Sequence, residues 1–364
     1  MSYANAKMLH STYVCIPPIR MDSDVRFDAL RAWLESALPV PMEGIAPASA
    51  DASFRRYFRV TLQSSFALPG AQTRVRTLIA MDAPPPHEDC RPFIAVATLL
   101  TAAGVHAPEV IAESPAQGFL LLSDLGTRTY LAELADATAP ALYRDASAAL
   151  VRWQLASKEG VLPRYDEALL RRELNLFPDW YIGKHLGIVL NDAQRATLAA
   201  AFERILANNL AQPCVYVHRD YHSRNLMICE PNPGVLDFQD AVYGPVTYDL
   251  VSLLRDAYVQ WSEEQQLDWA VRHWERARAA GLPVDRDFGA FWRDFEWMGV
   301  QRQLKVLGIF ARLYHRDGKD AYLQEMPRVM GYLRSACTRY NELRPLQRLL
   351  DELEARPATV GYTF

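Results

Sequence analysis

The chain has 364 residues, of which 50% are apolar, and a formal net charge of −4 at neutral pH. It is long enough for one large two-lobed domain or two ordinary domains, and too apolar for a disordered protein. Because Lys and Arg are scattered and the charges nearly balance, composition argues against a nucleic acid or an anionic membrane as the main partner. A small solute is the simpler expectation.

Cysteine usage and hydropathy bear on the compartment. The five cysteines lie far apart and form no Cys-x-x-Cys pair, which favours reduced thiols over a disulfide scaffold or a zinc site. No run of eighteen apolar residues occurs, and the first residues lack the apolar core and cleavage site of a signal peptide. We therefore expect a cytoplasmic protein, and a monomer.

The N-terminal part combines a leader with a small mixed lobe. Residues 1–24 lack a clear hydrophobic period and are predicted to be a mobile leader. A helix is expected after Ser23 as its N-cap, because apolar residues recur at helical spacing up to Leu38. The N-terminal lobe, residues 25–123, is then predicted to contain strands at 56–62, 74–81, 109–112 and 118–122 and a helix at 93–103.

The pattern changes near residues 123–126, which we take as the lobe boundary. Residues 124–364 are predicted to form a larger, mainly helical lobe. A short β-rich island at 214–238 interrupts its helices. These helices are predicted at 138–158, 166–186, 191–211, 245–280, 287–315 and 319–355.

The most informative segment lies in this island. Apolar runs lead into a polar loop that contains His-Arg-Asp220, and Asn225 follows Asp220 by five positions. Phosphoryl transfer needs a carboxylate to take the acceptor's proton and oxygen ligands for Mg²⁺. Asp220 fits the base, whereas Asn225 and Asp237 fit the metal ligands. One such residue alone is more often a turn or cap residue; the joint order and spacing carry the argument.

His218-Arg-Asp-x-His222-x-x-Asn225, followed by Asp237-Phe-Gln-Asp, resembles the aminoglycoside phosphotransferase and choline kinase family. The resemblance implies an α+β, protein-kinase-like fold of two lobes that uses ATP and Mg²⁺. It also implies that His218, His222 and Asp249 hold the catalytic loop in place and take no part in the chemistry. By residue type alone, His218 and His222 could instead bind zinc with the carboxylates, but zinc would leave Asn225 unexplained.

The phosphate-binding part departs from the kinase pattern. Residues 51–60 stand where the family's phosphate-covering hairpin lies, but they contain no glycine. We expect Ser53, Phe54, Arg55 and Arg59 to contact the nucleotide there, since arginine can bind two phosphate oxygens at once. Because side chains alternate along a strand, Arg55 and Arg59 are expected on one face and Arg56 on the opposite face. Met81 stands where the family has its lysine, and the next helix has no glutamate.

A strand entering the hinge is predicted at 118–122. The resemblance implies that the backbone of the next three residues, Ser123, Asp124 and Leu125, binds adenine. The triplet Asp124-Leu125-Gly126 is not the metal motif, because it precedes the catalytic loop.

Four segments give a narrower resemblance. They begin at Asp51 (Asp-Ala-Ser-Phe-Arg-Arg-Tyr-Phe-Arg), Ala80 (Ala-Met-Asp-Ala-Pro-Pro), Arg172 (Arg-Glu-Leu-Asn-Leu-Phe-Pro-Asp-Trp-Tyr) and Gln301 (Gln-Arg-Gln-Leu-Lys-Val-Leu-Gly). Together they resemble the bacterial anomeric N-acetylmuramate/N-acetylglucosamine kinases, from about residue 28 to the C-terminus. This implies phosphorylation of the anomeric hydroxyl to a sugar 1-phosphate in peptidoglycan recycling. The residues expected to contact the sugar are Glu173, Trp180, Asp240 and Arg302, with Tyr181, Glu296 and Trp297 as further pocket material.

Two alternatives remain open. The acceptor could be another small alcohol, of the aminoglycoside, choline or homoserine type. The chain could also be a nucleotide-binding pseudokinase scaffold, an idea motivated by Met81 and the missing glutamate. Retention of Asp220, Asn225 and Asp237 speaks against the scaffold, because a pure binding module would not need all three.

Overall fold

The structure, a computed structural model, describes residues 24–50, 54–67 and 74–354. The chain divides into two compact units, each treated by itself below. The first comprises residues 1–88 and 111–121, and the second comprises residues 89–110 and 122–364. The chain passes from the first unit to the second for the last time between Leu121 and Leu122, close to the predicted lobe boundary at 123–126.

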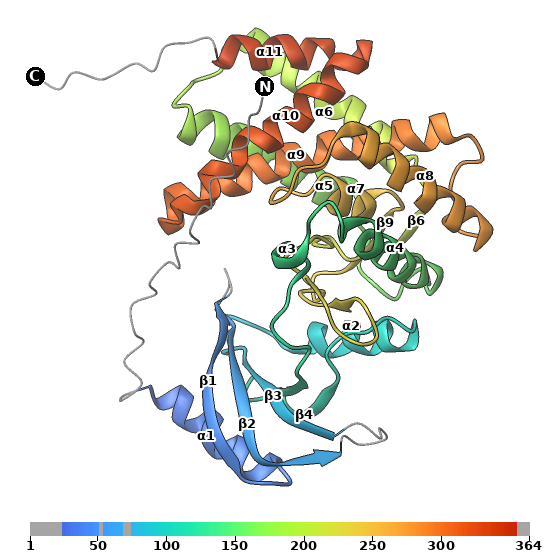
Figure 1. Cartoon of the computed structure of the whole chain (residues 1–364). Coiled ribbons are helices and arrows are strands. Elements are labelled where there is room, and N and C mark those ends of the chain that lie inside the picture. The colour runs from blue at the N-terminus through green and yellow to red at the C-terminus, as the bar shows by residue number, and fades with distance from the viewer. Residues whose placement is uncertain (1–23, 51–53, 68–73, 355–364) are drawn as a thin grey trace, which may run out of the picture. The chain divides into compact units, whose positions relative to one another are not determined.

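The first unit is built on a five-stranded sheet in the order β1-β2-β3-β5-β4 (Figure 1). Strands β1 to β3 form an antiparallel meander in which Arg56 pairs with Asp82 and Tyr57 with Met81. The predicted strands are confirmed, but β1 was not predicted; Pro47 and two register shifts hide its alternation. The strands are β1 (Met42–Ala50), β2 (Arg56–Ala67), β3 (Arg74–Asp82), β4 (Val110–Ser114) and β5 (Phe119–Ser123).

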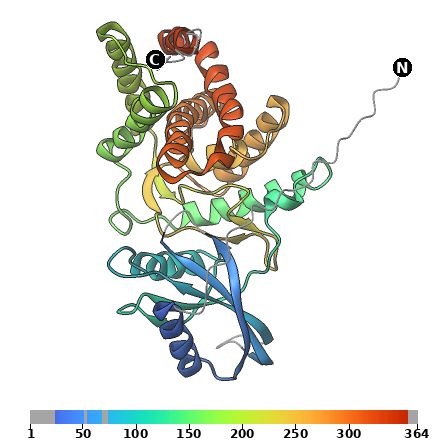
Figure 2. The same ribbon diagram turned by 90° about the vertical axis from the view of Figure 1, so that its left-hand side faces the viewer.

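Helix α1 (Val25–Ala37) packs on one face of this sheet (Figure 2). Its Phe27, Leu30 and Leu34 join a buried cluster with Phe58 and Val60 of β2. Since side chains alternate along a strand, Tyr57 and Arg59 lie on the opposite face. The predicted N-cap was wrong: Ser23 lies outside the described residues, and the Asp24 carboxylate accepts hydrogen bonds from the N–H groups of Arg26 and Phe27, both at 3.1 Å.

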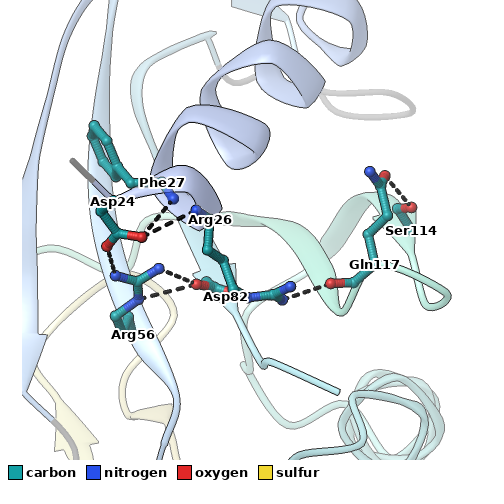
Figure 3. A network of polar contacts seen from close by, with 7 residues as sticks. All are labelled: Asp24, Arg26, Phe27, Arg56, Asp82, Ser114 and Gln117. Atoms are coloured by element: carbon teal, nitrogen blue, oxygen red, sulfur yellow. Dashed lines mark hydrogen bonds and ion pairs between the residues drawn. The ribbon is translucent and has the colours of Figure 1, made fainter. Parts of the chain in front are cut away.

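A charged network fastens α1 to the sheet (Figure 3). Asp82, whose side chain is inaccessible to solvent, accepts from Arg26 Nε at 2.7 Å and from Arg56 Nε at 3.0 Å. Arg56 also pairs with Asp24, and Arg26 Nη2 donates to the Gln117 carbonyl at 2.6 Å. Arg56 therefore has a structural role in the first unit, where it joins the start of α1 to β3.

The second unit is mainly helical (Figures 1 and 2), with two short antiparallel strand pairs. Among the described helices, none is long and apolar enough to cross a membrane. The pairs are β6 (Cys214–Val217) with β9 (Val242–Pro245) and β7 (Leu226–Met227) with β8 (Gly234–Val235). The α-helices are α2 (Arg91–Ala102), α3 (Tyr130–Glu133), α4 (Ala139–Leu155), α5 (Glu167–Leu176), α6 (Asp192–Leu210), α7 (Tyr248–Leu254), α8 (Glu263–Ala279), α9 (Phe288–Asp317), α10 (Met326–Arg339) and α11 (Arg344–Glu354).

Helix α9 is the centre of this unit, and residues 295–308 along it are all buried. At Gly308 a side chain would collide with the Leu176 backbone, so glycine permits the close approach of α5. The π-helical segment Phe177–His185 continues α5, as the predicted helix at 166–186 requires. Four of the six predicted helices are confirmed.

Two long predicted helices were wrong. The one at 245–280 is divided into α7 and α8, because Ser262 forms a capping box with Gln265 and starts a new helix. The one at 319–355 begins with a 3₁₀ turn (Asp320–Glu325) and is broken again after Arg339, where Tyr340 adopts extended backbone. Periodicity alone does not detect such breaks when apolar spacing continues through them.

Candidate active site

The catalytic loop joins β6 to β7 and is closed by hydrogen bonds within it. The His222 N–H donates to the Asp220 carbonyl at 3.0 Å, and the Asn225 N–H donates to the His222 carbonyl at 2.9 Å. The Asn225 side chain turns back, and its Nδ2 donates to the Asp220 carbonyl at 3.0 Å. The turn therefore brings the predicted base next to the first predicted metal ligand.

Asp237 follows β8, and its side chain lies next to that of Asn225. Its backbone is left-handed, with a φ of 61°, a conformation that costs a non-glycine residue free energy. Asn225 Nδ2 donates to Asp237 Oδ2 at 3.3 Å, and Gln239 Nε2 donates to Oδ1 at 2.9 Å. The structure thus brings Asp220, Asn225 and Asp237 together.

The donor set at Asp237 fits a magnesium ion shared with phosphates. It offers one carboxylate and two side-chain amides, and the Gln239 Oε1 is buried without a hydrogen-bond partner among the described residues. Mg²⁺ prefers oxygen ligands and keeps positions for water and phosphate oxygens. Within the described ranges, no group of three or more His, Cys, Asp or Glu side chains is placed to bind a metal, as a zinc cage would need.

His218 is fixed as a neutral imidazole. Its Nε2 donates to the Leu236 carbonyl at 3.0 Å, and its Nδ1 accepts from the Asp220 N–H at 3.2 Å. Burial lowers the pKa of His218 to about 4, so the ring stays uncharged at neutral pH. Because both nitrogens are used inside the protein, the zinc alternative loses one of its ligands.

Asp249, at the start of α7, holds the backbone that precedes Asp220. Its Oδ2 accepts from the His218 N–H at 2.7 Å and its Oδ1 from the Arg219 N–H at 2.9 Å. Arg219 has a left-handed backbone with a φ of 77°, so these bonds stabilise a strained residue. Burial raises the pKa of Asp249 to about 7, against the two hydrogen bonds that lower it.

Asp220 is half-buried and surrounded by cations. Burial opposes ionisation of its carboxyl group, but the positive charge of Lys305, together with those of Arg219 and Arg302, holds its pKa below the usual value. The group is therefore an ionised carboxylate at neutral pH. Such a carboxylate can accept a proton from an alcohol during phosphoryl transfer.

Glu173 lies at the centre of a buried network on α5. Its Oε1 pairs with Arg219 and, at 3.1 Å, with Lys305 Nζ, and its Oε2 accepts from the Tyr165 hydroxyl. Lys305 also donates to the Tyr248 hydroxyl at 2.9 Å. The prediction that Glu173 contacts the sugar needs correction, since the residue is 4% exposed and both of its oxygens are bonded within the protein. It holds Arg219 next to the predicted base, Asp220.

The other predicted sugar residues differ in their surroundings. Asp240 is exposed, and Trp180 is half-buried on the π-helical segment. Arg302 is 4% exposed, and its Nη1 has no hydrogen-bond partner among the described residues. Glu296 and Trp297 were wrongly included as pocket material. Glu296 is inaccessible to solvent and is bonded to Arg255 at 2.9 Å and to the Tyr340 hydroxyl at 2.7 Å, and Trp297 packs in an edge-to-face contact with the Tyr340 ring.

The predicted nucleotide contacts of the first unit lie at the start of β2. Ser53 lies outside the described residues. Phe54 is exposed, and its ring stacks on His87 at 5.0 Å between centroids. Arg59 lies on the sheet face opposite α1, whereas Met81 is fully buried. Arg56, which was not expected to contact the nucleotide, forms ion pairs with Asp24 and Asp82.

The predicted adenine-binding residues belong to the second unit. The Ser123 N–H donates to the Glu109 carbonyl at 3.0 Å, and the Ser123 Oγ accepts from the Glu109 N–H at 2.9 Å. Ser123 therefore fixes this turn and cannot donate its N–H to adenine. Leu125 is buried, and the Asp124 side chain accepts from the Gly126 N–H at 2.9 Å.

Asp256 is a site residue that sequence reasoning missed. Its Oδ2 accepts from the Ser223 N–H and its Oδ1 from the Tyr258 N–H, both at 2.9 Å. It thereby joins the catalytic loop to the segment after α7. No motif or spacing marks Asp256, since its role depends on a loop that the sequence pattern assigned to one long helix.

Comparison with known proteins places the chain in a family. Residues 44–288 match the model of the phosphotransferase enzyme family. An N-acetylmuramate/N-acetylglucosamine kinase of Pseudomonas aeruginosa is 50% identical over 92% of this chain and 98% of that protein. The kinase of the same name from Neisseria meningitidis is 48% identical over the same shares of the two chains.

Solved structures share the fold at low sequence identity. A choline/ethanolamine kinase family protein from Mesorhizobium loti is 15% identical, with a TM-score of 0.59 over 90% of this chain and 99% of that chain. The amicoumacin kinase hAmiN, in complex with AMP-PNP, Ca²⁺ and Ami, is 14% identical, with a TM-score of 0.57 over 85% and 93% of the two chains. The resemblance inferred from the sequence and the expected kinase-like fold are confirmed. The chain belongs to the phosphotransferase enzyme family and is a sugar kinase.

Proposed function

We propose that this enzyme transfers the γ-phosphoryl group of ATP to the anomeric hydroxyl of N-acetylmuramate and N-acetylglucosamine. The products would be the sugar 1-phosphates, formed in the recycling of peptidoglycan in the cytoplasm. The observation that carries this proposal is the placement of an ionised Asp220 beside Asn225 and Asp237. The names of the relatives supply the sugars.

The proposed reaction gives each residue one task. The Asp220 carboxylate accepts the proton of the anomeric hydroxyl as that oxygen forms a bond to the γ-phosphorus, and the bond from the γ-phosphorus to the β,γ-bridging oxygen breaks to release ADP. Asn225 and Asp237 would hold Mg²⁺, which neutralises charge on the phosphates when bound. Asp249 and Glu173 keep Asp220 in place through its neighbours His218 and Arg219.

The anomeric hydroxyl suits such a base. It is the most acidic hydroxyl of a reducing sugar, because the ring oxygen withdraws electrons from the carbon that carries it. A carboxylate whose pKa is held low is a weak base, so it serves best with an acceptor that gives up its proton readily. Arg302, buried and near Asp220, is proposed to contact the sugar together with Asp240 and Trp180.

On the nucleotide side, we propose that Arg55 and Arg59 contact the α- and β-phosphates. Arginines are needed there because Met81 occupies the position of the family's lysine and cannot offer a positive charge. Ser53 and Phe54 would cover the phosphates, and the backbone of Asp124 and Leu125 would contact adenine. ATP and Mg²⁺ are the proposed cofactors, and a monomer is the proposed state.

A panel of acceptors tests the proposal. The purified enzyme would be incubated with γ-³²P-labelled ATP and N-acetylmuramate, N-acetylglucosamine, an aminoglycoside, choline or homoserine. Transfer of label to the two amino sugars alone is expected. Preferential transfer to another acceptor would favour the alternative of a different small-molecule kinase. Labelling of none of them, with nucleotide still bound, would favour the pseudokinase scaffold.

A further inference from the structure

Arg224, Tyr258 and Tyr322 form an arginine–tyrosine cluster beside the catalytic loop. The guanidinium carbon of Arg224 lies 4.1 Å from the ring centroid of Tyr258 and 5.9 Å from that of Tyr322. Tyr258 belongs to the segment between α7 and α8, and Tyr322 belongs to the 3₁₀ turn Asp320–Glu325. Three segments far apart in the sequence therefore meet at one cation.

The cluster is fastened to the residues that carry out the reaction. Arg224 directly precedes Asn225, and the loop turn between Asp220 and Asn225 is closed by hydrogen bonds. Asp256 binds the Ser223 and Tyr258 N–H groups with its two oxygens, so Tyr258 keeps its position relative to the loop. The His222 ring meets the Tyr258 ring edge-on at 5.6 Å. The Arg224 guanidinium is thus held at a defined place beside the catalytic loop, over the Tyr258 and Tyr322 rings.

The charge of Arg224 has no counterpart in the described part of the chain. Arg224 is exposed and makes no ion pair with a carboxylate of the described residues, whereas Arg219 in the same loop is paired with Glu173. Two tyrosine faces orient its planar fork without neutralising it. A guanidinium presents five N–H donors in a geometry that matches a carboxylate. An arginine held in this way is ready to bind an anionic group.

The two sugars of the proposed function differ in one charged group. N-acetylmuramate carries a lactyl ether on its third carbon, which ends in a carboxylate, and N-acetylglucosamine has a hydroxyl there. We propose that Arg224 binds this lactyl carboxylate and so favours N-acetylmuramate over N-acetylglucosamine, with Tyr258 and Tyr322 orienting the guanidinium. This inference rests on the proposed function, because it assumes that the anomeric hydroxyl lies at Asp220.

The test compares both sugars on one variant. Arg224→Gln should lower kcat/KM for N-acetylmuramate by on the order of a hundredfold, as a lost charge-assisted bidentate contact would. The value for N-acetylglucosamine should stay within about threefold of the wild-type value, since that sugar has no carboxylate to lose. KM for ATP should not change, which separates a sugar carboxylate from a nucleotide phosphate as the bound anion. Arg224→Lys should recover part of the loss.

Controls keep the outcome unambiguous. Arg272→Gln removes an arginine that pairs with Asp268 on the outer face of α8, and it should leave both sugars unaffected. Thermal unfolding would show that Arg224→Gln is folded. Equal losses with both sugars, no loss with either, or a raised KM for ATP alone would each overturn the inference. Failure of wild-type enzyme to phosphorylate either sugar would instead refute the proposed function.

Discussion

The ammonium group of Lys305 lies 3.1 Å from the Glu173 carboxylate, and both side chains are less than 10% exposed. Through the same oxygen, Glu173 also holds Arg219, the residue before Asp220. The charge of Lys305 is the largest of those that lower the pKa of Asp220. Helices α5 and α9 thus control both the position and the charge of the proposed base, Asp220, although neither contributes a residue to the loop.

Glu173→Gln should destabilise the enzyme strongly. The change leaves Lys305 and Arg219 buried without the carboxylate that compensates them, a situation that costs about 3 kcal/mol or more. We expect the free energy of unfolding, measured with urea, to fall by this amount. Asp268→Asn removes one partner of an exposed ion pair and serves as the control, with an expected loss of less than about 1 kcal/mol. Equal losses for the two variants would contradict this account.

Asp249→Asn should impair turnover more than binding. The asparagine amide keeps one acceptor oxygen but turns a donor toward the second N–H, so Arg219 is no longer held in its left-handed conformation. We expect kcat to fall by on the order of tenfold to a hundredfold, with KM for ATP nearly unchanged. Steady-state kinetics on a folded variant measures this, and an unchanged kcat would show that the contact is dispensable.

The three arginines at and just before the start of β2, Arg55, Arg56 and Arg59, should separate into two classes. Arg59→Ala, and in the same way Arg55→Ala, should weaken the use of ATP by on the order of tenfold to a thousandfold and leave the sugar's KM unchanged. Arg56→Ala should instead lower the free energy of unfolding by on the order of 2 kcal/mol, because buried Asp82 loses a partner. If Arg56→Ala raises KM for ATP while neither of the other variants does, the assignment of faces is wrong.

His273 should make the enzyme less stable in acid. It lies on α8, where its Nδ1 shares a hydrogen bond of 2.9 Å with the Ser147 hydroxyl, and burial lowers its pKa from 6.5 to about 3. Between these values the unfolded chain binds a proton that the folded chain excludes, so the free energy of unfolding falls by up to about 1.4 kcal/mol per pH unit as the pH drops.

His273→Gln removes the proton-binding group and with it this loss of stability in acid. Wild type should have the larger free energy of unfolding at pH 7, because its His273 forms the hydrogen bond to Ser147. The difference from His273→Gln should shrink steadily from pH 6.5 to pH 4 in urea titrations. His87→Gln, a change at an exposed histidine, is the matched control and should run parallel to wild type. A pH-independent difference between wild type and His273→Gln would contradict the prediction.

The sequence predicted which loop residues lie together better than it predicted the residues that support them. Asp220, Asn225 and Asp237 could be singled out because phosphoryl transfer needs these residue types in a fixed order and spacing, and their roles stay predictions. Asp256 and the buried pairing of Glu173 with Lys305 could not be found, since they depend on helix packing between distant segments. Arg56 was separated from Arg59 correctly, because alternation along a strand can be counted in the sequence.

The most direct test of the central claim is to identify the product. Wild-type enzyme would be mixed with Mg²⁺, ATP and N-acetylmuramate or N-acetylglucosamine, and ³¹P NMR would follow the new phosphate ester, with Asp220→Asn in parallel. We predict a phosphorus signal coupled to the anomeric proton of each sugar, together with ADP. Asp220→Asn should bind ATP as wild type does but form no such ester, because the carboxylate acts on the acceptor's proton. A phosphate coupled to any other sugar proton, or turnover by Asp220→Asn within tenfold of wild type, would contradict the account.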